Sequence, residues 1–213
     1  MIARQFFPRD PVFRAGLPKV PSCPACNRAK QRVEDTAAVT LQFGHASDAS
    51  RQVLTQRVPR TLRRNSRLLR ALRDGLRRAW VRQPSGLAIP GLVVKLNRRV
   101  LGDLRRWYEF IAKGLYRFEL GVPLPSVHLL YLVKPATVEQ FQVFHHRILA
   151  CDRSQRRSFA NGEFRYLYGL VKEEEVSLWL IIFKSVEVVA VTLGPDAPDD
   201  LRRKMEQFAW TSP

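Results

Sequence analysis

The residues in this sequence best suited to chemistry are Cys23 and Cys26, which lie three positions apart in the run Cys-Pro-Ala-Cys-Asn. Two thiolates so spaced on a tight turn can chelate one zinc ion, because the turn points both sulfurs the same way. A structural zinc site needs four ligands, and the chain has neither a second CxxC nor an HxxxH. The motif therefore predicts half of a zinc site, which His45 in a nearby loop would extend. Two thiols on a turn without metal are the alternative.

The run Cys23–Lys30, followed by Glu34 and Asp35, resembles the second half of the motif of zinc-stapled HNH-family endonucleases. The resemblance implies that Cys23 and Cys26 are zinc ligands and that Asn27 occupies the position of the final metal-binding Asn or His. It also implies a ββα unit and a catalytic divalent metal such as magnesium, which would stabilise the charge developing on a phosphate.

The first half of that motif, a CxxC followed by an acid and the general-base His, has no counterpart in the chain. The opening residues 2–10 resemble the piece that follows this His. We therefore expect either a start codon placed too late or a degenerate relative, and a nuclease that is catalytically incomplete as the chain stands. The resemblance covers roughly residues 2–35.

The same Cys-Pro-Ala-Cys run also resembles the active site of glutaredoxins, in which the motif opens a helix. Cys23 near a helix N-terminus, with Lys19 and Arg28 close in sequence, would have a lowered pKa and act as a nucleophile. That fold needs a strand running directly into the motif, and Pro18 and Pro21 disfavour one. A thiol redox protein is therefore the third functional hypothesis.

The charge of the chain predicts a polyanionic partner. The 213 residues hold 36 Lys and Arg against 19 Asp and Glu, a net charge of +17, and most of the cations are Arg. Such an excess attracts polyanions, and the planar guanidinium matches two phosphate oxygens at once. Nucleic acid, with DNA first, is the predicted partner. The alternative is a non-enzymatic basic interaction protein whose arginines are only solvated.

Residues 61–82 are predicted to form one amphipathic helix that carries most of this charge. Its apolar stripe, including Leu76 and Trp80, is expected to face a core. Asp74 is the only acid between residues 57 and 82, so the arginines lack i,i+4 partners. The predicted nucleic-acid-binding residues are Lys30 and the arginines of this segment: Arg60, Arg63, Arg64, Arg67, Arg70, Arg73, Arg77 and Arg78.

The hydrophobic patterning predicts an α+β fold with a helix-rich N-terminal and middle region and a C-terminal antiparallel β-meander. Helices are expected at 27–43, near 48–58, and at 98–120, 136–150 and 201–210. Residues 84–96 read as a bent pair of short strands, 127–133 as a strand, and 163–171, 176–183 and 186–193 as the meander. The expected division is a truncated zinc-knuckle segment (1–45), a basic helical region (46–135) and a C-terminal α+β region (136–213).

Neither a membrane partner nor secretion is expected. The first ten residues lack an apolar core of the signal-peptide type, and Lys184 and Glu187 interrupt the most apolar stretch. Three cysteines, Cys23, Cys26 and Cys151, do not suggest a disulfide scaffold. The sequence thus predicts a cytoplasmic protein.

Overall fold

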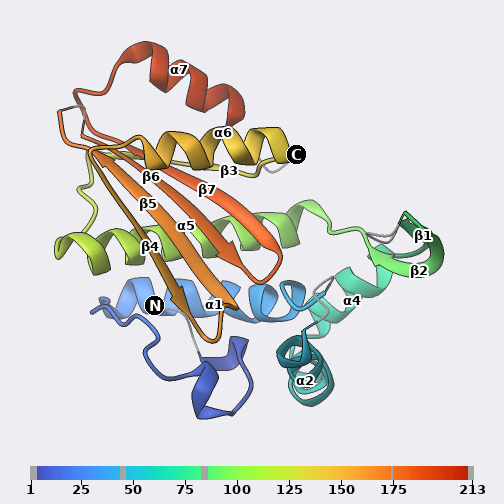
Figure 1. The fold of residues 1–213 in the computed structure, drawn as a ribbon. Helices are drawn as coiled ribbons and strands as arrows, with labels where there is room; N and C mark the ends of the chain where they lie inside the picture. The colour runs from blue at the N-terminus through green and yellow to red at the C-terminus, as the bar shows by residue number, and fades with distance from the viewer. Residues whose placement is uncertain (1–3, 44–46, 83–85, 174, 211–213) are drawn as a thin grey trace.

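A computed structural model describes residues 4–43, 47–82, 86–173 and 175–210. Its C-terminal part is a five-stranded antiparallel sheet in the order β3-β7-β6-β5-β4 (Figure 1). This confirms the α+β fold and the C-terminal meander. The strands are β3 (Leu129–Val133), β4 (Arg153–Phe159), β5 (Phe164–Val171), β6 (Val176–Phe183) and β7 (Val186–Leu193).

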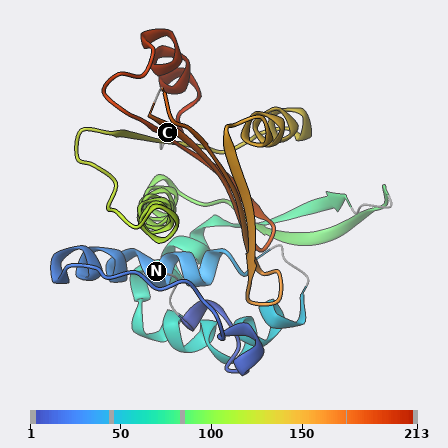
Figure 2. The same cartoon turned by 60° about the vertical axis from the view of Figure 1, so that its left-hand side comes forward.

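Helices cover both faces of this sheet (Figure 2). One face packs on α5 (Arg98–Leu120), which in turn lies on α1 (Pro24–Thr40), and here Trp107, Ile111 and Leu115 are fully buried. The other face packs on α6 (Val138–Leu149) and α7 (Asp199–Phe208) through Phe144, Ile148 and Met205. The period-2 alternation of the strands therefore supplies two cores, one on each face.

The meander is wider than predicted, because β3 and β4 extend it at its two edges. The strand β4 was missed, since its sequence Arg-Ser-Gln-Arg-Arg-Ser-Phe has no apolar run. Such a strand is stable at an edge, where only one neighbour, β5, pairs with it and its side chains remain largely in water. No helix in the described part of the chain is long and apolar enough to cross a membrane.

The basic middle region is built differently from the predicted helix 61–82, which is wrong in its second half. The segment forms α3 (Val58–Arg64), α4 (Ser66–Gly75) and then the strand β1 (Leu76–Arg82). Asn65 separates the two helices, because its backbone is not helical and its Oδ1 accepts a hydrogen bond from the N–H of Leu68 at 3.0 Å. Together with α2 (Asp48–Gln56), these helices enclose a small separate core of Val39, Val53, Val58, Leu68, Leu72 and Val100.

The strand β1 pairs with β2 (Ala88–Val94) as a two-stranded antiparallel hairpin, where the sequence had suggested a bent pair of short strands at 84–96. Gly75 ends α4 at the base of this hairpin. A Cβ atom there would collide with the backbone carbonyl of Lys95, whose N–H donates to the Gly75 carbonyl at 2.9 Å. As a result Leu76 and Trp80, expected in the core, are 42% and 74% exposed.

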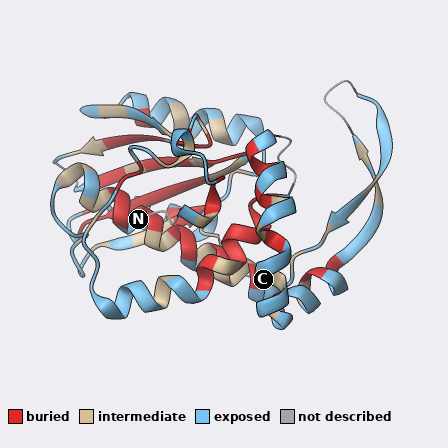
Figure 3. Cartoon of the chain, turned by 90° about the horizontal axis from the view of Figure 1, so that it is seen from below, coloured by how far each residue is buried: buried red, intermediate tan, exposed pale blue. Residues whose placement is uncertain are grey.

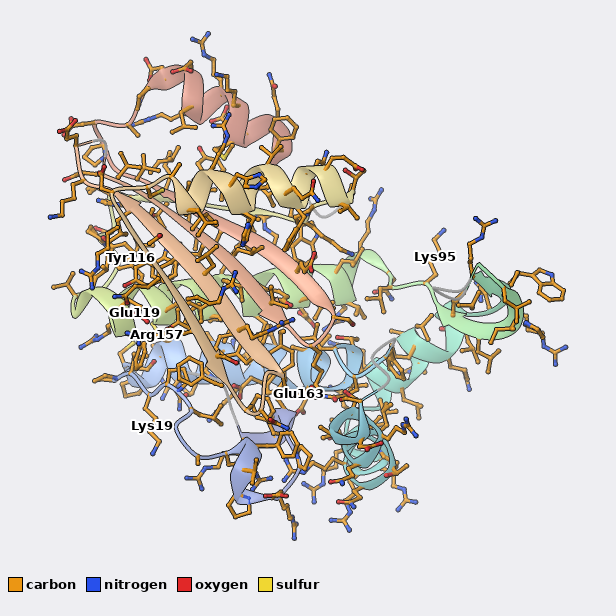
Figure 4. All side chains as sticks on the ribbon, in the orientation of Figure 1. Lys19, Lys95, Tyr116, Glu119, Arg157 and Glu163 are labelled. Carbon is orange, nitrogen blue, oxygen red and sulfur yellow. The ribbon has the colours of Figure 1, made fainter. Side chains whose placement is uncertain are left out.

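A buried ion pair joins the helical half of the molecule to the sheet. Lys184, in the turn between β6 and β7, donates from Nζ to Glu163 Oε2 at 2.9 Å and to Ser50 Oγ of α2 at 2.7 Å. Figure 4 shows Glu163 at the end of the sheet nearest α2. Burial lowers the pKa of Lys184, and the contact with Glu163 opposes that change.

We expect Lys184→Met to lower the free energy of unfolding by about 3–5 kcal/mol, because it leaves a carboxylate buried without its cation. The double variant Glu163→Gln/Lys184→Met should recover at least half of that loss. Lys172→Met, which removes an exposed lysine of the same sheet region, is the control. Urea unfolding measures all three. Equal stability of the Lys184→Met and Lys172→Met variants would contradict a structural role for the pair.

Candidate nucleic-acid interface

The predicted residues Arg60 and Arg63 line a pocket of about 370 Å³ together with Arg9 and Arg57. None of the lining residues is acidic; the others are Thr55, Gln56 and Pro59. Arg9 comes from the N-terminal segment, and the remaining arginines come from the end of α2 and from α3. Four arginines from two distant parts of the chain thus line one pocket.

Backbone carbonyls, rather than carboxylates, hold arginines at this pocket. Arg57 Nη1 donates to the carbonyl of Arg4 at 3.1 Å, and the neighbouring Arg14 Nε donates to that of Pro8 at 2.6 Å. Burial lowers the pKa of Arg57, and the charges of Arg14 and Arg9 lower it further. When neighbouring cations lower the pKa of a guanidinium, the region has a positive potential. A bound anion would reduce that potential.

A second pocket, of about 300 Å³, contains the predicted residues Arg64 and Arg67 together with Arg32 of α1 and Arg99 of α5. One acid, Asp103, lines it and accepts a hydrogen bond from Thr36 Oγ1 at 3.1 Å. Asp35 is also near Arg64: burial raises the pKa of that carboxyl, and the charge of Arg64 opposes the rise. The charge of this pocket is therefore positive, and the two carboxyl groups offset part of it.

The other predicted arginines, Arg70, Arg73, Arg77 and Arg78, are exposed along α4 and β1. Arg73 Nε lies 3.6 Å from Asp74 Oδ1. Arg77 Nη1 donates hydrogen bonds to the backbone carbonyls of Asp74 and Leu76, at 2.8 and 2.7 Å. Lys30 differs from them, because it is half-buried on α1 and pairs with Glu34. Its ammonium is thus already neutralised within the protein.

Four arginines of the two pockets were missed by sequence reasoning: Arg9, Arg32, Arg57 and Arg99. Arg57 directly precedes α3 in the sequence, whereas Arg9, Arg32 and Arg99 are brought beside the segment only by tertiary packing. No local pattern identifies these three. The predicted nucleic-acid-binding residues therefore stay a prediction. The fold distributes them over two pockets, α4 and β1, and not along one helical face.

The cysteine motif forms the first turn of α1. Cys23 is the N-cap residue, and its Sγ accepts a hydrogen bond from the N–H of Cys26 at 3.3 Å. This bond lowers the pKa of Cys23, while the thiol of Cys26, facing Cys23, has a raised pKa. Both thiols are exposed and free. The arrangement suits thiolate chemistry at Cys23, either as a metal ligand or as a nucleophile.

The described residues do not complete a metal site around this motif. Within them, no group of three or more His, Cys, Asp and Glu side chains is placed to hold an ion. Asn27 is exposed on the first turn of α1, and its N–H donates to the Cys23 carbonyl at 3.0 Å. The zinc half-site at Cys23 and Cys26 thus stays a prediction, and Asn27 alone does not define a magnesium site. His45 lies outside the described residues.

The strand that a glutaredoxin-like active site needs is missing before Cys23. Residues 4–23 contain two short 3₁₀ turns, Arg4–Phe6 and Pro11–Phe13, and no strand. The prolines at 18 and 21 account for this, because each lacks a backbone N–H for a sheet ladder. The thiol redox hypothesis is therefore supported by the lowered pKa of Cys23 but not by the secondary structure that precedes it.

A separate polar cluster surrounds Glu119 at the C-terminal end of α5. Its carboxylate accepts hydrogen bonds from Tyr166 at 2.5 Å, from Tyr168 at 3.1 Å and from Arg157 Nε at 3.1 Å. Figure 4 shows Glu119 and Arg157 side by side. Burial alone would raise the pKa of Glu119, but these hydrogen bonds outweigh it and hold the pKa below its usual value. A carboxylate so fully bonded joins α5 to β4 and β5 instead of serving as a base.

No protein-family model, curated protein or solved structure matches this chain. The HNH resemblance therefore depends on the residues of the α1 turn, and the nucleic-acid hypothesis depends on the arginines described above.

The lowered pKa of Cys23 predicts selective alkylation. As pH is raised from 6, iodoacetamide should modify Cys23 before Cys151, whose pKa is raised by burial and by the charge of Asp152. Peptide mass spectrometry at fixed times measures both rates. The Cys26→Ser variant keeps the backbone N–H that bonds Cys23, so it should preserve this order. Identical pH profiles for Cys23 and Cys151 would refute the assignment.

The lowered pKa of Glu119 predicts a pH-dependent stability. A carboxylate with a depressed pKa in the folded state stabilises the protein above its unfolded pKa, near 4.3, and loses that contribution as pH falls through the folded value. At pH 7, Glu119→Gln should lower the free energy of unfolding by about 1–3 kcal/mol. The difference from wild type should shrink below about pH 4. Glu173→Gln, at an exposed acid, should show neither effect.

Proposed function

We propose that this chain binds nucleic acid, DNA in the first instance, through an arginine surface formed by its two pockets. The surface comprises Arg9, Arg57, Arg60 and Arg63 in the first pocket and Arg32, Arg64, Arg67 and Arg99 in the second. The observation that carries the proposal is that four arginines line each of the two pockets, with a single lining carboxylate, that of Asp103.

Phosphate is the anion that this arrangement suits best. Each guanidinium presents several N–H donors in one plane, which match the oxygens of a phosphate in pairs. The charges of Arg14 and Arg9 act on Arg57 and lower its pKa, and a phosphodiester chain offers a row of negative charges to relieve that repulsion. A solvated protein surface gains little from such crowding. This favours the polyanion over the alternative of a merely basic interaction protein.

The resemblance of the cysteine motif on α1 supports, within this proposal, an HNH-endonuclease-like protein that acts in the cytoplasm. Cys23 and Cys26 would contribute to a structural zinc, and Asn27 would stand where the family holds its divalent metal. The described residues supply neither the remaining ligands nor a general base at this turn. The proposal is accordingly one of binding, and no hydrolytic step is assigned to these residues.

Binding should weaken steeply with salt. If five to eight arginines contact phosphates, the logarithm of the association constant should fall against the logarithm of salt concentration with a slope of roughly −4 to −7. Fluorescence anisotropy with a labelled duplex across a salt series measures the slope. An absent or salt-independent signal would refute the proposal.

The slope should depend on the arginine surface and not on net charge. The variant Arg60→Gln/Arg63→Gln/Arg64→Gln/Arg67→Gln should flatten it by about one for each phosphate that an arginine no longer neutralises. A matched control removes four exposed cations from the far side of the sheet: Lys134→Gln/Arg147→Gln/Lys172→Gln/Arg203→Gln. An equal decrease in affinity for the two variants would show non-specific attraction by total charge. An unchanged slope in the first variant would exclude α3 and α4 from the interface.

A further inference from the structure

The hairpin of β1 and β2 projects from the body of the protein in every view (Figures 1, 2 and 3). Its seven pairs run from Leu76 opposite Val94 to Arg82 opposite Ala88. Apart from its base, where Lys95 bonds Gly75, the ribbon lies away from the cores of the molecule. Figure 3 shows that the described hairpin residues are exposed or half-buried. An isolated two-stranded ribbon has little stability of its own. We therefore look for a function of this hairpin that its contribution to the fold does not explain.

One face of the ribbon alternates cations with a large aromatic ring. Successive side chains of a strand point to opposite faces, so Arg78, Trp80 and Arg82 share one face. Their partners on β2 are Leu92, Pro90 and Ala88, which lie on the same face. Trp80 is 74% exposed and Leu92 66%. A flat apolar surface is thus held in water between two guanidiniums.

Charge decides what can cover this face. From Gly75 to Asn97 the sequence contains Arg77, Arg78, Arg82 and Lys95 and no acid. A second copy of the same hairpin would bring the same charges together and be repelled. A partner that offers both negative charges and flat apolar groups at short intervals complements the face, and a nucleic-acid strand has this combination in its phosphates and bases.

We propose that this hairpin is an arm on which Trp80 stacks against exposed bases of single-stranded DNA while Arg78 and Arg82 contact the flanking phosphates. The proposal rests on the proposed function, since it names the strand form and the contact by which the arginine surface is extended. Arg78 and Arg82 are four residues apart, about 13 Å along a strand. Trp80 lies midway between them on the same face, so a base stacked on the ring would have a guanidinium on either side.

The test uses the full chain and a mixed-sequence single-stranded DNA oligonucleotide of about 20 nucleotides. The emission of Trp80 should be quenched as the oligonucleotide is added, whereas Trp107 and Trp179 are fully buried and should contribute a constant background. Any change from the half-buried Trp210 is measured separately, because it persists in the Trp80→Ala variant. Trp80→Ala should abolish the quenching and weaken binding by about 5- to 100-fold. Trp80→Phe should retain most of the affinity, because it keeps a ring that can stack.

Salt dependence separates the aromatic contribution from the ionic one. Trp80→Ala should leave the slope of log affinity against log salt unchanged, because stacking releases no counterions. Arg78→Gln/Arg82→Gln should flatten it by about two. Since all three side chains are exposed, the thermal unfolding of each variant should match that of the wild type, which excludes misfolding as the cause.

The outcomes are distinguishable. Salt-dependent binding by the wild type with no quenching, and with full affinity in Trp80→Ala, would overturn the arm while leaving the proposed function intact. No binding of the oligonucleotide while the duplex still binds would overturn the arm alone, and no binding of either at any salt concentration would overturn both. A wild type that dimerises in light scattering and becomes monomeric in Trp80→Ala would assign the ribbon to self-association and overturn the proposal.

Discussion

The architecture depends on the turn between β6 and β7, where two neighbouring residues join the sheet to everything that precedes it in the chain. Phe183 packs against Phe6 and Trp107, with ring centroids 5.3 and 5.5 Å away, and so joins the N-terminal segment, α5 and the sheet. Lys184 reaches Glu163 and Ser50 and so fixes α2. Because the first pocket is formed by the N-terminal segment and the α2–α3 junction, both of these contacts position its arginines.

This attachment explains how the fold tolerates a net charge of +17. The arginines of α3, α4 and β1 lie on elements that contribute only a small core of their own, whereas the large apolar cores belong to the sheet with α5 and α6. Repulsion among the arginines therefore acts on a peripheral part of the molecule and leaves the main cores undisturbed. An anion bound there would relieve the repulsion and stabilise that part most.

The sequence was sufficient for the elements whose own pattern decides their structure. The helix 98–120 and the three strands after residue 163 match α5, β5, β6 and β7, because their burial follows a clear period. Prediction from the sequence failed where contact with a distant segment determines the local structure. Leu76 and Trp80 fit a helical stripe, yet they form a strand because β2 pairs with them and Gly75 ends α4. The two pockets were unpredictable for the same reason, since Arg9, Arg32 and Arg99 reach them only through tertiary packing.

The two features singled out by the sequence, the cysteine turn and the arginines, are connected through α1. Arg28 and Arg32 are four residues apart and share a face of this helix, and Arg32 lines the second pocket. Cys26 lies six residues before Arg32, about 9 Å along the axis, or roughly three nucleotide rises. Six residues also turn the helix by about 600°, so Cys26 and Arg32 point to different faces of α1, and the second pocket is near the cysteine turn along the helix axis but not on its face. Under the HNH interpretation, the arginine surface would hold the substrate beside the metal centre and not at the bond to be cleaved.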